Sequence, residues 1–134
     1  MIRQKAKVKD VAQPSPPPHD IRQRTFLFAV RVVKACRRLE KAGASRDLVR
    51  QLMRSATSVG ANAEEAQAGQ SRADFISENA ICLKEARESH YWLRLLQAAE
   101  VSDDRELPAL EQESLELARI FGSIITSAKR NSVR

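Results

Sequence analysis

The chain has 134 residues, of which 43% are hydrophobic and 30% are charged, and its formal net charge is +6. This length suits one domain with a single core. The many alanine, leucine, arginine and glutamate residues and the scarcity of aromatic ones favour helices over sheets, and no window approaches the 18 apolar residues of a membrane span. The basic N-terminus lacks the apolar segment of a secretory signal. Cys36 and Cys82 form no CxxC pair, so we expect buried, reduced thiols and a cytoplasmic location.

The charge is unevenly distributed along the chain. Residues 25–60 hold eight basic and two acidic side chains, whereas residues 61–128 hold six basic and thirteen acidic ones. Both ends of the chain are basic, with a balance of +4 over residues 1–24 and +3 over residues 129–134. Such an asymmetry bears on partners and association rather than on the fold.

The two ends of the chain differ in composition from the rest. Residues 1–19 combine lysines with four prolines among positions 14–18, so they can bury little apolar surface. We expect a disordered, basic and proline-rich N-terminal tail there. The folded part is predicted at residues 20–130, and residues 131–134 are predicted to form a basic C-terminal tail.

The first helix is predicted from Asp20 to about Ala42. Asp20 and Gln23 have the spacing of a capping box, and Gly43 suits the left-handed position that ends a helix. Its first half is apolar around most of its circumference, which is more than one buried stripe requires. We therefore expect this helix to contact another subunit, through the apolar residues Phe26, Leu27, Phe28 and Val32.

A second helix is predicted from Ser45 or Asp47 to about Gly69. Its apolar residues recur at steps of three and four, the spacing of a buried stripe; they are Val49, Leu52, Ala56, Val59, Ala63 and Ala66. Gly60 costs about 1 kcal/mol relative to alanine inside a helix. We therefore expect its missing side chain to admit a neighbouring backbone or a bulky group.

Two further helices complete the pattern. Ser71 and Asp74 have capping-box spacing and predict a third helix that reaches about Ala99. The fourth is predicted to open at the acidic pair of residues 103–104, with Pro108 tolerated in its first turn. Four helices of about 20 residues with short connections predict an all-α fold, an antiparallel up-down-up-down four-helix bundle. The apolar stripe of the fourth helix is Leu110, Leu117, Phe121 and Ile124.

Two stretches carry a resemblance to a known family. Residues 54–62, RSATSVGAN, are followed by Glu64-Glu65-Ala66 and by the residues SRADFI at 71–76. This sequence resembles the signature of the four-helix bundle proteins named after 23S rRNA intervening sequences, although Ala66 replaces the usual glycine and Asp74 the usual glutamate. The residues AICLKEARE and YWLRLL, at 80–88 and 91–96, are similar to the third helix of the family.

This resemblance has implications for assembly and partners. It covers roughly residues 21–130 and implies a bacterial protein that assembles as a ring-shaped homopentamer. Some members of the family are similar to the accessory protein of diversity-generating retroelements, which works with a reverse transcriptase and RNA. We accordingly expect a homo-oligomer, with RNA or DNA and a reverse transcriptase as candidate partners and no membrane contact.

The sequence offers no residues for a familiar catalytic centre. A di-iron bundle needs Glu-x-x-His pairs, but the only histidines are His19 and His90, and neither is three residues after a glutamate. Ser55, Thr57 and Ser58 lie on a predicted helix with no histidine nearby in the sequence, and there is no glycine-rich phosphate loop and no CxxC pair. We therefore predict no catalytic residue, no cofactor and no metal, and we expect a protein that is not an enzyme.

Three polar residues match the motif of the family. They are Asn62, Glu65 and Glu88. They could form a polar site shared between the second and third helices. The favoured interpretation is a hydrogen-bonded network that sets helix register, because a buried polar group without a partner costs a few kcal/mol.

Basic side chains lie on one face of each of the first two helices. They are Arg31, Lys34, Arg37, Arg38 and Lys41 on the first, and Arg46, Arg50 and Arg54 on the second. Together with the tails they could bind phosphates in a salt-sensitive and sequence-independent way. Alternatively, they pair with acidic faces of the other helices, which would leave a purely structural or protein-interaction module. Tyr91 and Trp92 could stack on bases, although aromatic residues beside leucines are more often core or interface anchors.

Overall fold

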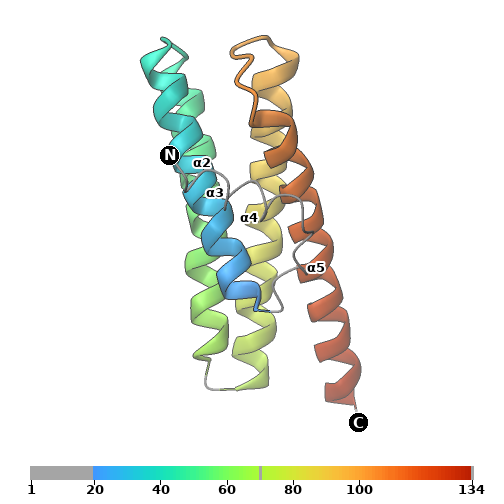
Figure 1. Ribbon diagram of the computed structural model, residues 1–134. Coiled ribbons are helices and arrows are strands. Elements are labelled where there is room, and N and C mark those ends of the chain that lie inside the picture. The colour runs from blue at the N-terminus through green and yellow to red at the C-terminus, as the bar shows by residue number, and fades with distance from the viewer. Residues whose placement is uncertain (1–19, 70, 134) are drawn as a thin grey trace, which may run out of the picture.

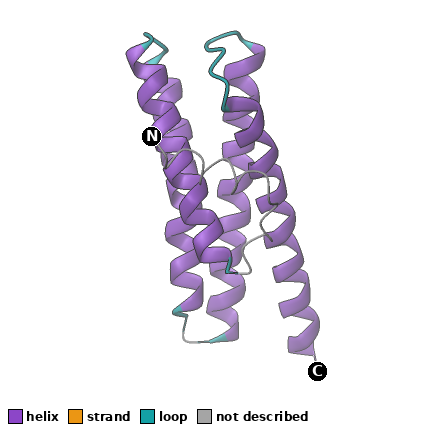
Figure 2. Ribbon diagram, viewed as in Figure 1, coloured by secondary structure: helices purple, strands orange, loops and turns teal. Residues whose placement is uncertain are grey.

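The computed structural model describes residues 20–69 and 71–133 of the chain. Within these residues lie four helices, α2 (Ile21–Lys41), α3 (Arg46–Gln67), α4 (Arg72–Ala98) and α5 (Leu107–Val133). Successive helices run in opposite directions and pack against one another, with the α2–α3 and α4–α5 connections at the same end (Figures 1 and 2). The predicted all-α, up-down four-helix bundle is confirmed. The tail predicted at residues 1–19 lies outside the described residues.

The predicted helix starts depend on short polar side chains. Asp20, Ser45 and Ser71 precede α2, α3 and α4, and each side chain accepts a hydrogen bond from a backbone N–H two or three residues further on. These bonds satisfy N–H groups that have no partner within the helix. Gly43 has a φ of 88°, the left-handed conformation expected after α2. The capping signals in the sequence therefore located these boundaries within a residue or two.

Helix α5 begins later and ends later than predicted. The chain turns at Glu100, whose φ is 56°, and the acidic pair of residues 103–104 belongs to the connection before the helix. There Asp104 Oδ1 accepts a hydrogen bond from the backbone N–H of Glu106 at 3.0 Å. Pro108 is the second residue of α5, where it interrupts no helical hydrogen bond. The helix continues to Val133, so residues 131–133 belong to it rather than to a separate tail.

The core is formed by the apolar stripes of all four helices. Every residue predicted for the stripe of α3 is at most 3% exposed; these are Val49, Leu52, Ala56, Val59, Ala63 and Ala66. From α5, Leu110, Leu117 and Phe121 are fully buried, and Ile124 packs against the core. No helix in the described part of the chain is both long enough and apolar enough to cross a membrane.

Gly60 marks a close approach of α2 to α3. A Cβ atom added at Gly60 would lie 3.4 Å from the carbonyl oxygen of Thr25, which belongs to α2. A larger side chain at this position would therefore have to displace backbone. The expectation that the missing side chain admits a neighbouring backbone is confirmed.

Both cysteines are buried free thiols, as predicted. Burial raises the pKa of Cys36 and of Cys82 to about 12, so both remain protonated at neutral pH. Cys36 Sγ lies 3.8 Å from the carbonyl oxygen of Val49, and Cys82 Sγ lies 3.6 Å from that of Val59. Each thiol thus contacts α3 from a neighbouring helix.

Candidate nucleic-acid interface

Three arginines of α2, spaced seven residues apart, face α5. Seven residues make two helical turns, so these side chains lie on one side of α2. Each binds a carboxylate of α5 or of the connection before it, at N–O distances of 2.7–3.2 Å; the pairs are Arg24 with Glu113 and Glu116, Arg31 with Glu106, and Arg38 with Asp104. Arg31 and Arg38 of the predicted nucleic-acid surface are therefore already engaged within the chain.

These ion pairs shift the ionisation of their members. The hydrogen bond from Arg38 lowers the pKa of Asp104, and the same bond raises the pKa of the Arg38 guanidinium. The hydrogen bond to Glu113 raises the pKa of Arg24, although partial burial acts in the opposite direction. The Arg38–Asp104 pair is therefore charged at neutral pH, and its opposite charges hold α2 against the connection that leads into α5.

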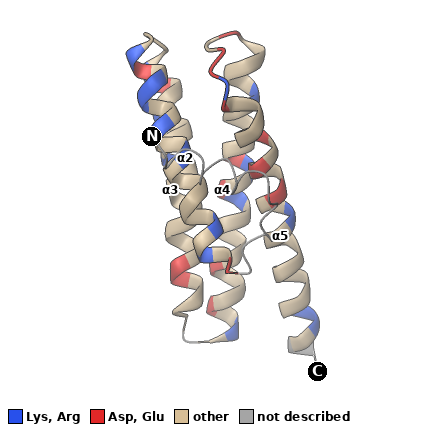
Figure 3. Cartoon of the chain, in the orientation of Figure 1, with Lys and Arg blue, Asp and Glu red and all other residues tan. Residues whose placement is uncertain are grey.

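The other basic residues near the α2–α3 turn form no ion pair with any residue that the structure describes. They are Lys34, Arg37, Lys41, Arg46 and Arg50, and all five are exposed. Figure 3 shows basic residues gathered at this end of α2 and α3. Of the predicted surface, this cluster is the part that remains available to an anionic partner; we call it the turn cluster.

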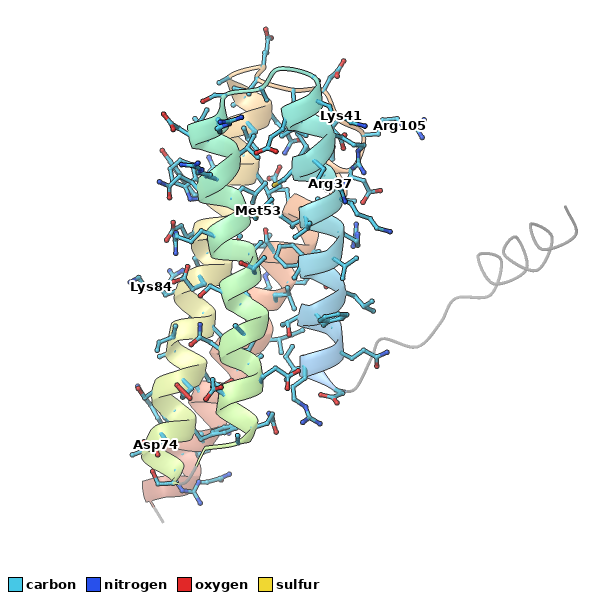
Figure 4. All side chains as sticks on the ribbon, turned by 90° about the vertical axis from the view of Figure 1, so that its left-hand side faces the viewer. Arg37, Lys41, Met53, Asp74, Lys84 and Arg105 are labelled. Atoms are coloured by element: carbon cyan, nitrogen blue, oxygen red, sulfur yellow. The ribbon has the colours of Figure 1, made fainter. Side chains whose placement is uncertain are left out.

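The fold adds a basic residue that the sequence analysis missed. Arg105 is exposed on the α4–α5 connection, at the same end and on the same side of the bundle as Arg37 and Lys41 (Figure 4). No periodic pattern marks a residue in a connection, so only the folded chain reveals this neighbourhood. A cavity of about 490 Å³ beside it has a mixed lining of Arg38, Asp103, Asp104, Arg105 and Glu106. Its three carboxylates make this cavity a poor phosphate site.

Arg54, the last residue of the predicted surface, turns toward α4. It binds the carboxylate of Glu85 at 3.4 Å and also that of Glu88. Glu88 in turn accepts a hydrogen bond from Trp92 Nε1 at 3.1 Å. Burial raises the pKa of Glu88, but the hydrogen bonds from Trp92 and Arg54 outweigh this effect, so the pKa lies below its usual value. Arg54 therefore joins α3 to α4.

The structure does not bring the predicted network of Asn62, Glu65 and Glu88 together. Asn62 Nδ2 donates to the carbonyl oxygen of Ser58 on its own helix, at 2.8 Å. Glu65 is exposed and makes no side-chain hydrogen bond within the described part of the chain, and Glu88 binds Arg54 and Trp92. Asn62 and Glu65 lie two or more turns beyond Arg54 along α3, which is too far along the helix to meet Glu88.

The buried polar contact between α3 and α4 involves other residues. Ser55 and Ser89 are fully buried, and their hydroxyl oxygens lie 2.9 Å apart. Ser89 also donates to the carbonyl oxygen of Glu85 at 2.9 Å. The signal for this pair was present in the sequence, since Ser89 lies between Ala86 and Leu93 at the spacing of the buried stripe of α4.

A second exposed basic surface lies on α4. Lys84, Arg87, Tyr91 and Arg94 follow at steps of three and four, and all are exposed; we call them the outer α4 face. Lys84 projects to the opposite side of α3 from Arg37 and Lys41 (Figure 4). The regular spacing is visible in the sequence, but the basic residues of α4 were not part of the predicted surface.

The four residues predicted at a subunit interface have different environments. Phe28 and Val32 are 1% and 0% exposed, because they point into the core of their own bundle. They are thus unavailable to another subunit, and this part of the expectation needs correction. Phe26 and Leu27 are 62% and 46% exposed, so an interface there stays a prediction.

The described residues contain no group of three or more histidine, cysteine, aspartate or glutamate side chains that could hold a metal ion. His90 Nε2 lies 3.7 Å from Glu111 Oε2, without a third such residue beside them.

Known proteins show a clear similarity to this chain. Residues 18–123 match the 23S rRNA-intervening sequence protein family. A crystal structure from Bacteroides thetaiotaomicron, of a protein with unknown function from the S23 ribosomal protein family, is 38% identical with a TM-score of 0.74. The match covers 78% of this chain and 97% of that one. No curated protein matches the chain.

Proposed function

This chain belongs to the 23S rRNA-intervening sequence protein family, and we propose that it is a non-enzymatic, homo-oligomeric scaffold that binds nucleic acid. The observation that carries the proposal is the turn cluster, five exposed basic residues without a carboxylate partner in the described structure. Basic side chains whose charge is not neutralised within the protein attract phosphates, and binding releases the counterions of the nucleic acid. Three of the five are arginines, whose forked guanidinium suits phosphate oxygens.

The apolar surface of α2 supports self-association. Phe26 and Leu27 are adjacent and are 62% and 46% exposed, so burial of both against another subunit would remove apolar surface from water. A homopentamer is the assembly that the family resemblance implies. In such a ring each subunit contributes its own basic surface, so individually weak contacts to one nucleic-acid chain add up to stable binding.

The partner in this proposal is RNA or DNA, alone or bound to a protein such as a reverse transcriptase. The non-enzymatic role is part of the proposal. The alternative function, a structural or protein-interaction module, is supported in part by the intramolecular pairs of Arg31, Arg38 and Arg54. Three of the eight predicted contact residues already have partners.

Binding of labelled RNA and DNA, measured by fluorescence anisotropy over a salt series, distinguishes these functions. We expect affinity to fall steeply between about 50 and 200 mM salt, with a slope of about −0.7 to −0.9 per phosphate contact. The variant R46E/R50E should bind at least about tenfold more weakly, since it replaces attraction by repulsion at two phosphate contacts. The control is Arg22→Gln, because Arg22 is exposed but pairs with its neighbour Asp20.

Sedimentation velocity on the same variants separates binding from assembly. The proposal requires R46E/R50E to keep the sedimentation coefficient of the wild type while it loses affinity. Loss of assembly in this variant would place the two arginines in a subunit interface and support the alternative. Salt-independent binding, or none, would contradict the proposal directly.

A further inference from the structure

Tyr91 on α4 is an aromatic side chain that the bundle does not bury. It is 52% exposed, and its ring centroid lies 5.0 Å from that of Trp92 in an edge-to-face arrangement. Trp92 is held in turn by its hydrogen bond to Glu88. The tyrosine ring therefore packs against a fixed neighbour, and about half of the residue is open to solvent.

Positive charge surrounds this ring. Arg87 lies one turn before Tyr91, Arg94 one turn after it, and Lys84 two turns before it, all exposed. None of the three forms an ion pair with a carboxylate among residues 20–69 and 71–133. The nearest carboxylate of α4, Glu88, is engaged by Arg54 of α3. Glu88 also interacts electrostatically with Lys84, but it forms no ion pair with a basic residue of the outer α4 face.

Helix α5 extends this surface. Between the two helices lies a groove of about 450 Å³, lined by Leu83, Arg87, His90, Leu115, Ala118 and Arg119. Its apolar residues can accept the flat surface of a base or the carbons of a sugar. Its two arginines, both exposed, lie where a backbone phosphate could be bound.

We propose that the outer α4 face is a binding site for single-stranded nucleic acid, in which an unpaired base stacks on Tyr91 and basic residues bind the flanking phosphates. The phosphate contacts are assigned to Lys84, Arg87, Arg94 and Arg119. This inference rests on the proposed function and names its ligand class. An aromatic ring with cations on either side is the arrangement by which proteins bind single strands irrespective of sequence. A duplex keeps its bases stacked on one another, so it cannot offer a base to a side chain on the convex surface of a helix.

The outer α4 face is also well placed in the proposed assembly. Lys84 and Arg37 project to opposite sides of α3 (Figure 4), and α4 shares no packed interface with α2. Subunits that associate through Phe26 and Leu27 of α2 would leave Tyr91 open. The pentameric assembly would then carry the turn clusters and the outer α4 faces of its subunits as separate surfaces.

The single tryptophan provides a direct test. Trp92 is the only tryptophan of the chain, and it contacts Tyr91, so a base that stacks there should change its fluorescence. We propose titration with single-stranded oligo(U) and with a duplex of equal length. We expect the single strand to quench Trp92 and to bind at least about tenfold more tightly than the duplex at equal salt.

Variants of Tyr91 test the contribution of the aromatic ring separately from that of the basic residues. Tyr91→Phe keeps the ring and should bind as the wild type does. Tyr91→Ser should bind oligo(U) about tenfold more weakly, which corresponds to about 1.4 kcal/mol and lies within the range of base–aromatic stacking. Its salt dependence should be unchanged, because no charge is removed.

A charge variant tests the phosphate contacts. R87Q/R94Q should reduce the salt slope for oligo(U) by about 1.4, since each lost phosphate contact on a single strand contributes about 0.7. The matched control R22Q/R72Q removes two exposed arginines from outside both proposed surfaces and should leave the slope unchanged.

Each failure has a distinct meaning. Binding of nucleic acid by the wild type with an unaffected Tyr91→Ser, or equal affinity for duplex and single strand, would overturn this inference and leave the proposed function standing. A changed sedimentation coefficient for Tyr91→Ser would assign the ring to a subunit contact and also overturn it. If the wild type binds no nucleic acid at all, the proposed function fails first.

Discussion

Helix α2 is attached to its two neighbours by different forces. Toward α3 the contact is close and apolar, as Gly60 lies against the backbone at Thr25 and the thiol of Cys36 reaches the carbonyl of Val49. Toward α5 the backbones approach least closely, and arginine–carboxylate pairs bridge the gap. The contact of α2 with α3 thus depends on burial and shape, whereas ion pairs add to the contact on the α5 side.

This difference has a physical consequence for stability. Burial of apolar surface is largely insensitive to moderate salt, whereas partly exposed ion pairs are screened by it. Helix α2 is also the shortest of the four, with 21 residues against 27 in α4 and in α5. We therefore expect the α2–α5 side to loosen before the α2–α3 side when salt rises or pH falls.

The largest predicted effect comes from a variant that disrupts the apolar packing of α2. Leu39 is 1% exposed, so Leu39→Ala removes buried methyl groups and leaves a cavity. We expect a loss of about 3 kcal/mol in the free energy of unfolding, measured by urea denaturation at fixed protein concentration. The loss should be the same at low and high salt. A loss that shrinks with salt would contradict the assignment of this contact to burial.

A second variant tests the close approach at Gly60. Gly60→Val places a branched side chain against the backbone of Thr25 and should destabilise the fold by about 2 kcal/mol in the same assay. Gly60→Ala is the control, because the gain in helix propensity of about 1 kcal/mol offsets the tighter contact at 3.4 Å. If valine is tolerated as well as alanine, the two helices are not held at this distance.

A third variant tests the ionic side of α2. Arg24 and Glu113 are each 17% exposed and form the least exposed of these pairs. Arg24→Gln should cost about 1 kcal/mol, because it leaves the carboxylate without its charged partner. A double-mutant cycle with Glu113→Gln should show a coupling energy that decreases as salt increases. A coupling energy that does not change with salt would contradict the expectation that the α2–α5 contact is more sensitive to salt than the α2–α3 contact.

The smallest predicted effect is a response to acid. The hydrogen bond from Arg38 lowers the pKa of Asp104 below its usual value of 3.8. Ionised Asp104 therefore stabilises the fold above about pH 3.8, and this contribution is lost as pH falls through the lower pKa of the folded state. Thermal melting in acid should show a smaller drop in Tm for Asp104→Asn than for the wild type. Equal drops in Tm for the two proteins would show that Asp104 does not contribute to the loss of stability in acid.

Much of the fold was predictable because it depends on local signals. The apolar stripe of α3 and the caps Asp20, Ser45 and Ser71 follow from periodicity and from hydrogen bonding within a few residues. The start of α5 was not predictable in this way. The acidic pair at 103–104 fits the first turn of a helix, but the turn at Glu100 and the pairing of Asp104 with Arg38 place it in a connection.

The candidate site was less predictable because exposure and pairing depend on distant residues. Arg31 and Lys34 are equivalent in the sequence pattern, yet only Arg31 meets a carboxylate, Glu106, 75 positions further along the chain. Phe26 and Phe28 likewise look alike, and only the packing of α2 shows that one is buried and the other exposed. The spacing of the outer α4 face is visible in the sequence, but its exposure became evident only in the folded chain.

The reactivity of the two buried thiols can report when the helices of the bundle separate. Cys36 becomes reactive only when α2 separates from α3, and Cys82 only when α4 does. Both thiols react as thiolates, and their raised pKa keeps the thiolate fraction low while the helices are packed together. Alkylation followed by mass spectrometry would therefore rank the two separations by rate, without any engineered label.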